Sequence, residues 1–188
     1  MKRWRIPLAA MIAGILIVMV LAVPVKRAFT FTETRTDNPE LVYLPIKDDS
    51  EFQIRYVHSI FLTNVYETYR VQSDNSLKFL AMRYEDVGIG LPAYAEEGET
   101  LSVTKDGIYT LTYKDKVIDS FVLYIGDVDA QLAFRYKGIE KDLKAYLERG
   151  HSYEFCVKKL TLYELMKGVN LNGKAKKRTE SGSDNGSE

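Results

Sequence analysis

An uncharged apolar run near the N-terminus constrains the fold of this 188-residue chain more than any other feature. Residues 6–25 read IPLAAMIAGILIVMVLAVPV, twenty positions without a charged side chain. A helix of that length rises roughly 30 Å, which is the hydrocarbon thickness of a bilayer. We therefore predict an N-terminal transmembrane helix within residues 1–27.

A cleaved signal peptide is the alternative interpretation of the same run. Its apolar region normally covers about 7–15 residues and ends in a small-x-small cleavage site. Here the run is longer and residues 24–27 read PVKR, so an uncleaved signal anchor is preferred. Lys2, Arg3 and Arg5 precede the run and favour a single-pass cell-membrane protein whose C-terminal domain is extracytoplasmic.

Composition argues against several classes of site. Lysine and arginine total 26, as do aspartate and glutamate, so no basic field is available for nucleic acid. The single cysteine, Cys156, leaves no intramolecular disulfide and no cysteine-based metal cluster. Two histidines leave a metal site short of its usual ligands. We expect no cofactor, no metal and no nucleic-acid partner.

Short alternating apolar runs dominate the chain beyond a polar, threonine-rich segment at 28–38, which we interpret as a stalk. Alternation over four to eight residues, bounded by turn residues, is typical of strands. The predicted strands cover residues 41–46, 51–58, 65–71, 77–84, 101–104, 108–113, 120–125, 132–136 and 153–160. Asp106-Gly107 between two such runs predicts a β-hairpin.

Two short helices complete the expected domain. Residues 140–148 favour a helix ended by Gly150, and Thr161-x-x-Glu164 has the spacing of a capping box that starts a helix running toward Gly168. The resulting class is mainly β, an antiparallel β-sandwich or small barrel, spanning residues 39–171. Residues 172–188 contain no large apolar side chain and are expected to be a disordered polar tail.

His58 and Glu67 lie on faces of successive strands that both point inward in this interpretation. A buried carboxylate is costly unless paired, and histidine is a natural partner, so we predict that the two meet across the sheet. A structural pair is preferred, and a site for a small polar or anionic ligand is the alternative. Ser59 points away from His58, and no nucleophile elbow occurs, so no catalytic residue is assigned, although a hydrolase stays open.

The glycine-rich segment at 88–92 is not a phosphate loop, because no Gly-Lys-Ser/Thr follows it. It forms the last of three motifs that occur in order along the chain. The motifs are Tyr56-x-His58-Ser59, Val65-x-Glu67-x-Tyr69 and Gly88-x-Gly90-Leu91-Pro92. Together they resemble the signature of the domain-of-unknown-function 1850 family, over roughly residues 52–168.

The resemblance implies a partner by association. Members of that bacterial family are short, are often preceded by one hydrophobic segment, and are often encoded beside tripartite ATP-independent periplasmic (TRAP) transporters that use a TAXI solute-binding protein. The resemblance therefore implies a membrane-tethered accessory protein that contacts a transporter subunit or the solute-binding protein. A small-ligand-binding or sensing module independent of transport is the alternative. The binding residues implied are His58, Ser59, Glu67, Gly88, Gly90, Leu91 and Pro92.

Overall fold

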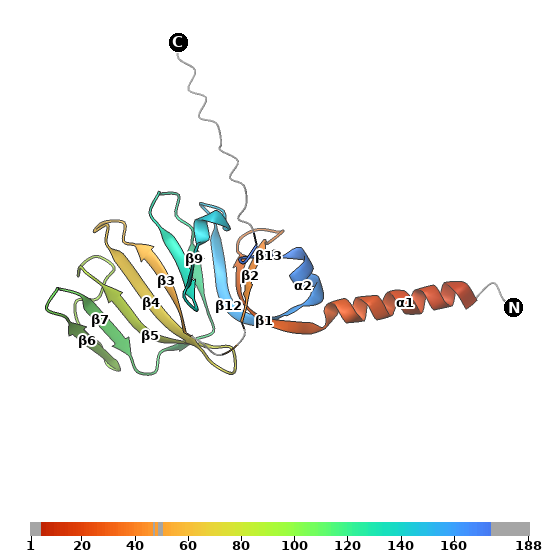
Figure 1. Cartoon of the computed structure of the whole chain (residues 1–188), viewed down its shortest axis with the longest axis horizontal. Helices are drawn as coiled ribbons and strands as arrows, with labels where there is room; N and C mark the ends of the chain where they lie inside the picture. Colours follow the sequence, from red (N-terminus) through yellow and green to blue (C-terminus); the bar gives the residue numbers. More distant parts are fainter. Residues whose placement is uncertain (1–4, 47, 49–50, 174–188) are drawn as a thin grey trace, which may run out of the picture.

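Two β-sheets form the body of the protein, and one helix projects from it (Figure 1). The structure is a computed structural model that describes residues 5–46, 48 and 51–173. Helix α1 covers Arg5–Ala22 and passes almost directly into the first strand. The predicted mainly β domain is therefore confirmed.

The five-stranded sheet is built around the N-terminal strand β1 (Pro24–Glu33). β1 lies between β2 (Leu41–Pro45) and β12 (Ser152–Thr161), and its pairing with β12 extends over nearly its full length. β9 (Ser120–Tyr124) adds to the outer side of β12, and β13 (Val169–Asn170) pairs in parallel with β2. The two ends of the described chain thus meet in one sheet.

Most neighbouring strands of the eight-stranded sheet are consecutive in the chain and pair as antiparallel hairpins. Its order is β11-β10-β3-β4-β5-β7-β6, with β8 pairing to β5. The strands are β3 (Glu51–Val57), β4 (Asn64–Val71), β5 (Leu77–Tyr84), β6 (Glu99–Val103), β7 (Tyr109–Tyr113), β8 (Val117–Ile118), β10 (Leu132–Tyr136) and β11 (Ile139–Asp142). The β6–β7 hairpin confirms the prediction from Asp106-Gly107, and the Gly107 φ of 80° is one that glycine adopts readily.

Aromatic rings from both sheets fill the space between them. The Phe29 ring of β1 lies 5.0 Å from the rings of Phe52 and Phe134 in the other sheet. Phe155 of β12 contacts Phe52 at 5.2 Å. The sheets therefore share one core, and in the described residues neither sheet closes on itself. The small-barrel alternative is wrong.

The stalk predicted at 28–38 is also wrong for its first half. Phe29, Thr30 and Phe31 are fully buried, and β1 hydrogen-bonds to a strand on each side. Thr30 and Thr32 belong to β1 and not to a polar linker. The Thr30 hydroxyl, for example, donates to the Cys156 carbonyl at 3.1 Å.

The helix predicted over 140–148 is replaced by a strand and one short turn of helix. β11 pairs with β10 through a tight turn at Lys137-Gly138, where both residues have positive φ. Such angles at both central positions favour a two-residue hairpin, which draws residues 139–142 into the sheet. Only η1 (Leu143–Ala145) is helical, and the Asp142 carboxylate caps it.

Helix α2 (Leu162–Lys167) confirms the capping-box prediction. The Thr161 hydroxyl accepts from the Glu164 amide at 3.1 Å, and the Glu164 carboxylate accepts from the Thr161 amide at 2.8 Å. The backbone amide groups of the first turn are thereby satisfied. The tail predicted to be disordered lies outside the described residues from 174 onward.

The helix predicted to cross the membrane is shorter in the structure than the apolar run. The N-terminal helix ends at Ala22, before the end of the apolar run, because Pro24 already belongs to β1. Within the described residues, no helix is both long enough and apolar enough to cross a membrane.

Candidate functional site

Glu67 lies at the centre of a cluster formed by residues of the first two motifs. Its carboxylate accepts a hydrogen bond from the Tyr69 hydroxyl at 2.7 Å and another from the Tyr56 hydroxyl at 3.2 Å. The β3–β4 register places Glu67 opposite Ile54 and Tyr56 opposite Val65, so all of these side chains share the inner face. Ile54 and Val65 are fully buried.

Burial controls the electrostatics of this cluster. Burial raises the pKa of the Glu67 carboxyl, while the two tyrosine hydrogen bonds and the Lys116 charge oppose that change. Burial, together with the Glu67 charge, raises the pKa of Tyr56 and of Tyr69. Both phenols therefore remain donors across the physiological range. Because each carboxylate oxygen accepts a neutral hydroxyl, the cluster suits a structural role better than a general base.

The predicted His58–Glu67 pair is wrong, because the β3–β4 ladder ends before His58. Val57 pairs with Asn64, and the chain then turns. The His58 Nε2 donates to the Ile89 carbonyl at 3.0 Å, and Nδ1 accepts from the Ile60 and Phe61 amides at 3.3 Å each. This tautomer follows from the main-chain partners.

The same contacts bear on the hydrolase alternative. Main-chain groups occupy both ring nitrogens of His58, and Ser59 is exposed in the turn beyond it. The arrangement therefore offers Ser59 no base from that ring. Among the described side chains, no group of three or more histidine, cysteine, aspartate or glutamate residues is arranged to hold a metal ion.

His58 joins two loops, one between β3 and β4 and the other after β5. Its ring stacks on Phe61 with centroids 5.0 Å apart, and Phe61 in turn packs against Gly88. A Cβ on Gly88 would lie 2.8 Å from the Phe61 ring, so a larger residue would displace that ring. The Thr63 hydroxyl adds a 3.2 Å bond to the Asp86 carboxylate.

The joined loops carry large apolar side chains into solvent. We name this set the loop rim, and it comprises Ile60, Leu62, Ile89 and Tyr94, which are 56%, 74%, 75% and 72% exposed. Leu62 also has a positive φ of 58°, which is uncommon for a leucine. The rim is thus an apolar surface on a backbone fixed by His58.

The third motif also lines a cavity of about 480 Å³. Gly90, Leu91 and Pro92 form one wall, and Tyr113 and Lys116 form another. The Lys116 ammonium lies 4.6 Å from the centre of the Tyr113 ring. Burial raises the pKa of Tyr113 to about 12, with smaller effects from Glu99 and Glu67. The cavity is therefore electrostatically linked to the Glu67 cluster.

The predicted binding residues thus separate into three environments. Gly90, Leu91 and Pro92 come together at the cavity, and Glu67 sits on the inner face of the sheet. His58 and Gly88 lie in the loop contact, with Ser59 exposed in the turn beside it. Tyr56 and Tyr69 belong to the predicted motifs, but their hydrogen bonds to Glu67 were not predicted. The Glu-x-Tyr spacing of the second motif was the available signal, since it places Glu67 and Tyr69 on one face of a strand.

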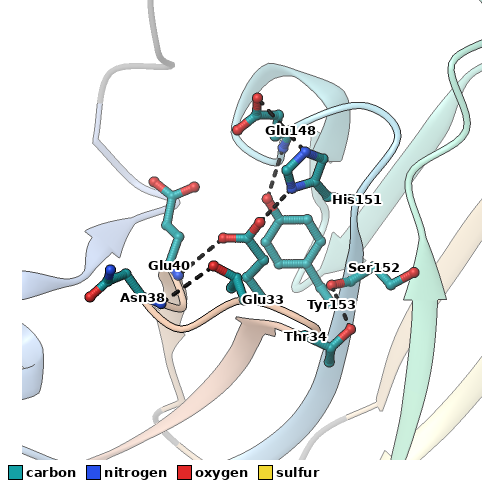
Figure 2. A network of polar contacts seen from close by, with 9 residues as sticks. Glu33, Thr34, Asn38, Glu40, Glu148, His151, Ser152 and Tyr153 are labelled. Atoms are coloured by element: carbon teal, nitrogen blue, oxygen red, sulfur yellow. Dashed lines mark hydrogen bonds and ion pairs between the residues drawn. The ribbon is translucent and has the colours of Figure 1, made fainter.

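A second polar cluster, missed from the sequence, ties the end of β1 to the turn before β12 (Figure 2). His151 Nδ1 contacts the Glu33 carboxylate, and the Glu148 amide donates to the Tyr153 hydroxyl at 3.0 Å. The hydrogen bond to Glu33 raises the pKa of His151. This cluster contains none of the motif residues.

Comparison with known proteins identifies the region that carries the motifs. Residues 52–143 match the model of a family described as a domain of unknown function, DUF1850. Residues 52–143 therefore form a DUF1850 domain. The DUF1850 match includes all three motifs and the strands from β3 to β11, and it leaves β1, β2 and β12 outside. No curated protein and no solved structure gave a significant match.

Proposed function

We propose that this DUF1850 protein is a non-enzymatic recognition module tethered to a cell membrane, an accessory of solute uptake whose loop rim binds a partner protein on the extracytoplasmic side. The observation that carries the proposal is the exposure of four large apolar side chains on two loops that His58 holds together. Large apolar side chains exposed on a backbone that hydrogen bonds hold in place favour protein recognition, because little conformational entropy is lost on binding.

The packed sheets suit this role as an antiparallel sandwich scaffold. The loop rim is carried by the β3–β4 turn and by the segment after β5. β3, β4 and β5 all lie inside the sheet, with a strand on each side. Loops placed on interior strands are held more firmly than loops at a sheet edge. Glu67 lies on β4, between β3 and β5, and its hydrogen bonds to Tyr56 of β3 and Tyr69 of β4 stabilise the inner face of the sheet.

The proposed tether is the N-terminal run of twenty uncharged residues. Eight apolar side chains between Met11 and Val20 are 49–65% exposed, so the β-rich body does not cover them. A lipid bilayer would remove that surface from water. We expect the full chain to stay in the membrane pellet after carbonate washing, and a chain lacking residues 1–22 to appear in the supernatant.

The partner proposed first is a subunit or the solute-binding protein of a TRAP-type (TAXI) transporter. This choice rests on the gene association implied by the family resemblance. The geometry contributes the surface, because a preformed apolar rim suits a folded protein better than a free solute.

Co-purification tests the proposal. A tagged full chain, extracted in mild detergent, is expected to retain a transporter component, and Leu62→Glu is expected to lose it because a charge enters the rim. Val122→Glu is the matched control, since Val122 is 64% exposed on β9, outside the rim. Equal recovery with both variants would remove the rim from the proposal.

A small-ligand-binding or sensing role is the second candidate, and the cavity of about 480 Å³ favours it. Lys116 is the basic group in its lining, and Glu96 and Glu99 are the acidic ones. The class proposed is therefore a small anionic ligand with a single carboxylate that pairs with Lys116. Calorimetric titration of the protein with a panel of short-chain carboxylates is expected to show saturable binding that Lys116→Gln abolishes. Binding that survives Lys116→Gln would place the ligand elsewhere.

A further inference from the structure

Helix α2 exposes two large apolar side chains next to the point where α1 leaves the body. Met166 is 78% exposed and Tyr163 is 53% exposed, although the opposite side of this short helix packs on the protein. α1 and α2 are in contact, and Figure 1 shows α2 beside the C-terminal end of α1. The exposed side chains of α2 therefore belong to an element that contacts α1.

This helix is held firmly in its orientation. Leu165 packs on a small cluster formed by Ala28, Tyr43 and Leu160 on the five-stranded sheet. The Tyr43 hydroxyl donates to the Leu165 carbonyl at 3.0 Å. Since the capping box also fixes the first turn, Tyr163 and Met166 cannot turn inward without breaking these contacts.

The charge around α2 is positive. Lys26 and Lys167 are exposed on β1 and α2, and Lys26 shares the sheet face of Leu160, which packs against α2. Glu164 is the acidic residue of α2, and Thr161 and Lys158 engage its carboxylate. The Lys167 ammonium lies 5.6 Å from the centre of the Tyr163 ring, so a cation and an aromatic ring are presented together.

We infer that α2 lies in the headgroup region of the bilayer that α1 enters, with Met166 and Tyr163 at the acyl boundary and Lys26 and Lys167 against anionic lipid. The inference rests on the proposed tether. Tyrosine and lysine are favoured at this depth, because a ring or stem is buried while the polar end stays hydrated. Two contacts with the membrane fix the orientation of the domain, whereas α1 alone would leave it free to tilt.

The consequence concerns how the loop rim is presented. The eight-stranded sheet lies on the side of the body away from α1 (Figure 1). With α2 seated on the lipid, that sheet is held out from the membrane. The motif loops would then face a partner that approaches from the extracytoplasmic space.

Site-specific quenching tests this placement in the full chain. The background is Cys156→Ser, because a serine hydroxyl preserves the contact of Cys156 with Thr30. Single cysteines at Val20, Met166 or Val122 carry a bimane fluorophore in phosphatidylcholine–phosphatidylglycerol vesicles that contain lipid with a shallow acyl-chain nitroxide. All three positions are more than half exposed, so labelling is compatible with folding, which circular dichroism checks.

We expect strong quenching at Met166→Cys and Val20→Cys, at least about twofold greater than at Val122→Cys, since interfacial side chains lie within reach of the shallow nitroxide. Vesicles of phosphatidylcholine alone are expected to reduce the quenching at Met166→Cys. Quenching at Val20→Cys without quenching at Met166→Cys would overturn the α2 placement and leave the tether standing. No quenching at Val20→Cys would refute the tether and the inference together, and equal quenching at all three positions would refute a specific seat for α2.

Discussion

Glu67 and Glu33 are carboxylates on interior strands of the two sheets, and they are partnered in contrasting ways. Glu67 is paired within the core by two tyrosine hydroxyls, which stay neutral. Glu33 is paired near the surface by His151, a ring that titrates near neutral pH. The comparison shows two ways to satisfy a partly buried carboxylate. Neutral donors satisfy it without bringing a second charge out of water, whereas a half-exposed histidine ring can carry its charge in contact with solvent.

Both arrangements make the folded protein bind protons more tightly than the unfolded chain does. Burial raises the pKa of Glu67, and the hydrogen bond to Glu33 raises the pKa of His151. A raised pKa in the folded state means that stability falls as pH rises past the unfolded value. The ordinary values are 4.5 for Glu67 and 6.5 for His151, so the two effects begin at different pH.

The largest expected effect is that of Glu67→Ala. It leaves two phenols without their acceptor, and each unsatisfied buried group costs about 1–3 kcal/mol, so the free energy of unfolding should fall by about 2–6 kcal/mol. Urea unfolding followed by circular dichroism measures the change. Glu67→Gln is the matched control and is expected to lose less, because its amide oxygen still accepts a hydroxyl. Equal losses in both variants would show that the hydrogen bonds contribute little.

Tyr69→Phe is expected to have the next largest effect. It removes the 2.7 Å bond to Glu67 while keeping the stacking of the ring on Phe79 and Phe52, and one such bond contributes about 1–2 kcal/mol. Tyr56→Phe removes the longer 3.2 Å bond and should cost less. The reverse order in urea titrations would contradict the assignment of Tyr69 as the principal donor.

The pH dependence of unfolding sharpens the comparison further. For Glu67, stability should be greatest below 4.5 and should fall as pH rises through the raised pKa of the folded state. Glu67→Gln cannot ionise, so the difference in unfolding free energy between wild type and this variant should change across that range. A difference that stays constant with pH would mean that Glu67 titrates equally in both states.

The smallest effect is expected from His151→Gln. Its pairing with Glu33 stabilises the fold fully below 6.5, and this contribution is lost as pH rises through the raised pKa of His151. The variant should therefore be less stable than wild type at pH 6 and nearly equal to it well above the folded-state pKa. Thermal melts at several pH values measure this. A difference that grows with pH would reverse the assignment.

The most accurate predictions from the sequence were those made from local patterns. The strands at 77–84 and 132–136 match β5 and β10 at both ends, and the hairpin at Asp106-Gly107 and the capping box at Thr161 were also found. Each of these depends on residues a few positions apart, so nearby side chains encode it. The family resemblance likewise rested on short motifs, and the DUF1850 match confirms it.

The errors concern contacts that join distant parts of the chain. The segment taken as a stalk is the centre of a sheet because β12, more than a hundred residues later, pairs with it. His58 bonds to Ile89 and not to Glu67, because the end of the β3–β4 ladder decides which face the histidine joins. Neither partner can be inferred from local alternation.

The sequence by itself determined the mainly β class, most strand positions, the second short helix and the motif residues of the candidate site. Only the tertiary structure decided which sheet each strand joins, that Tyr56 and Tyr69 satisfy Glu67, and that His58 joins the two loops. The physical reason is the range of each interaction. Backbone propensity and capping act within a few residues, whereas the pairing of a buried polar group depends on whichever side chains the packed sheets bring to it.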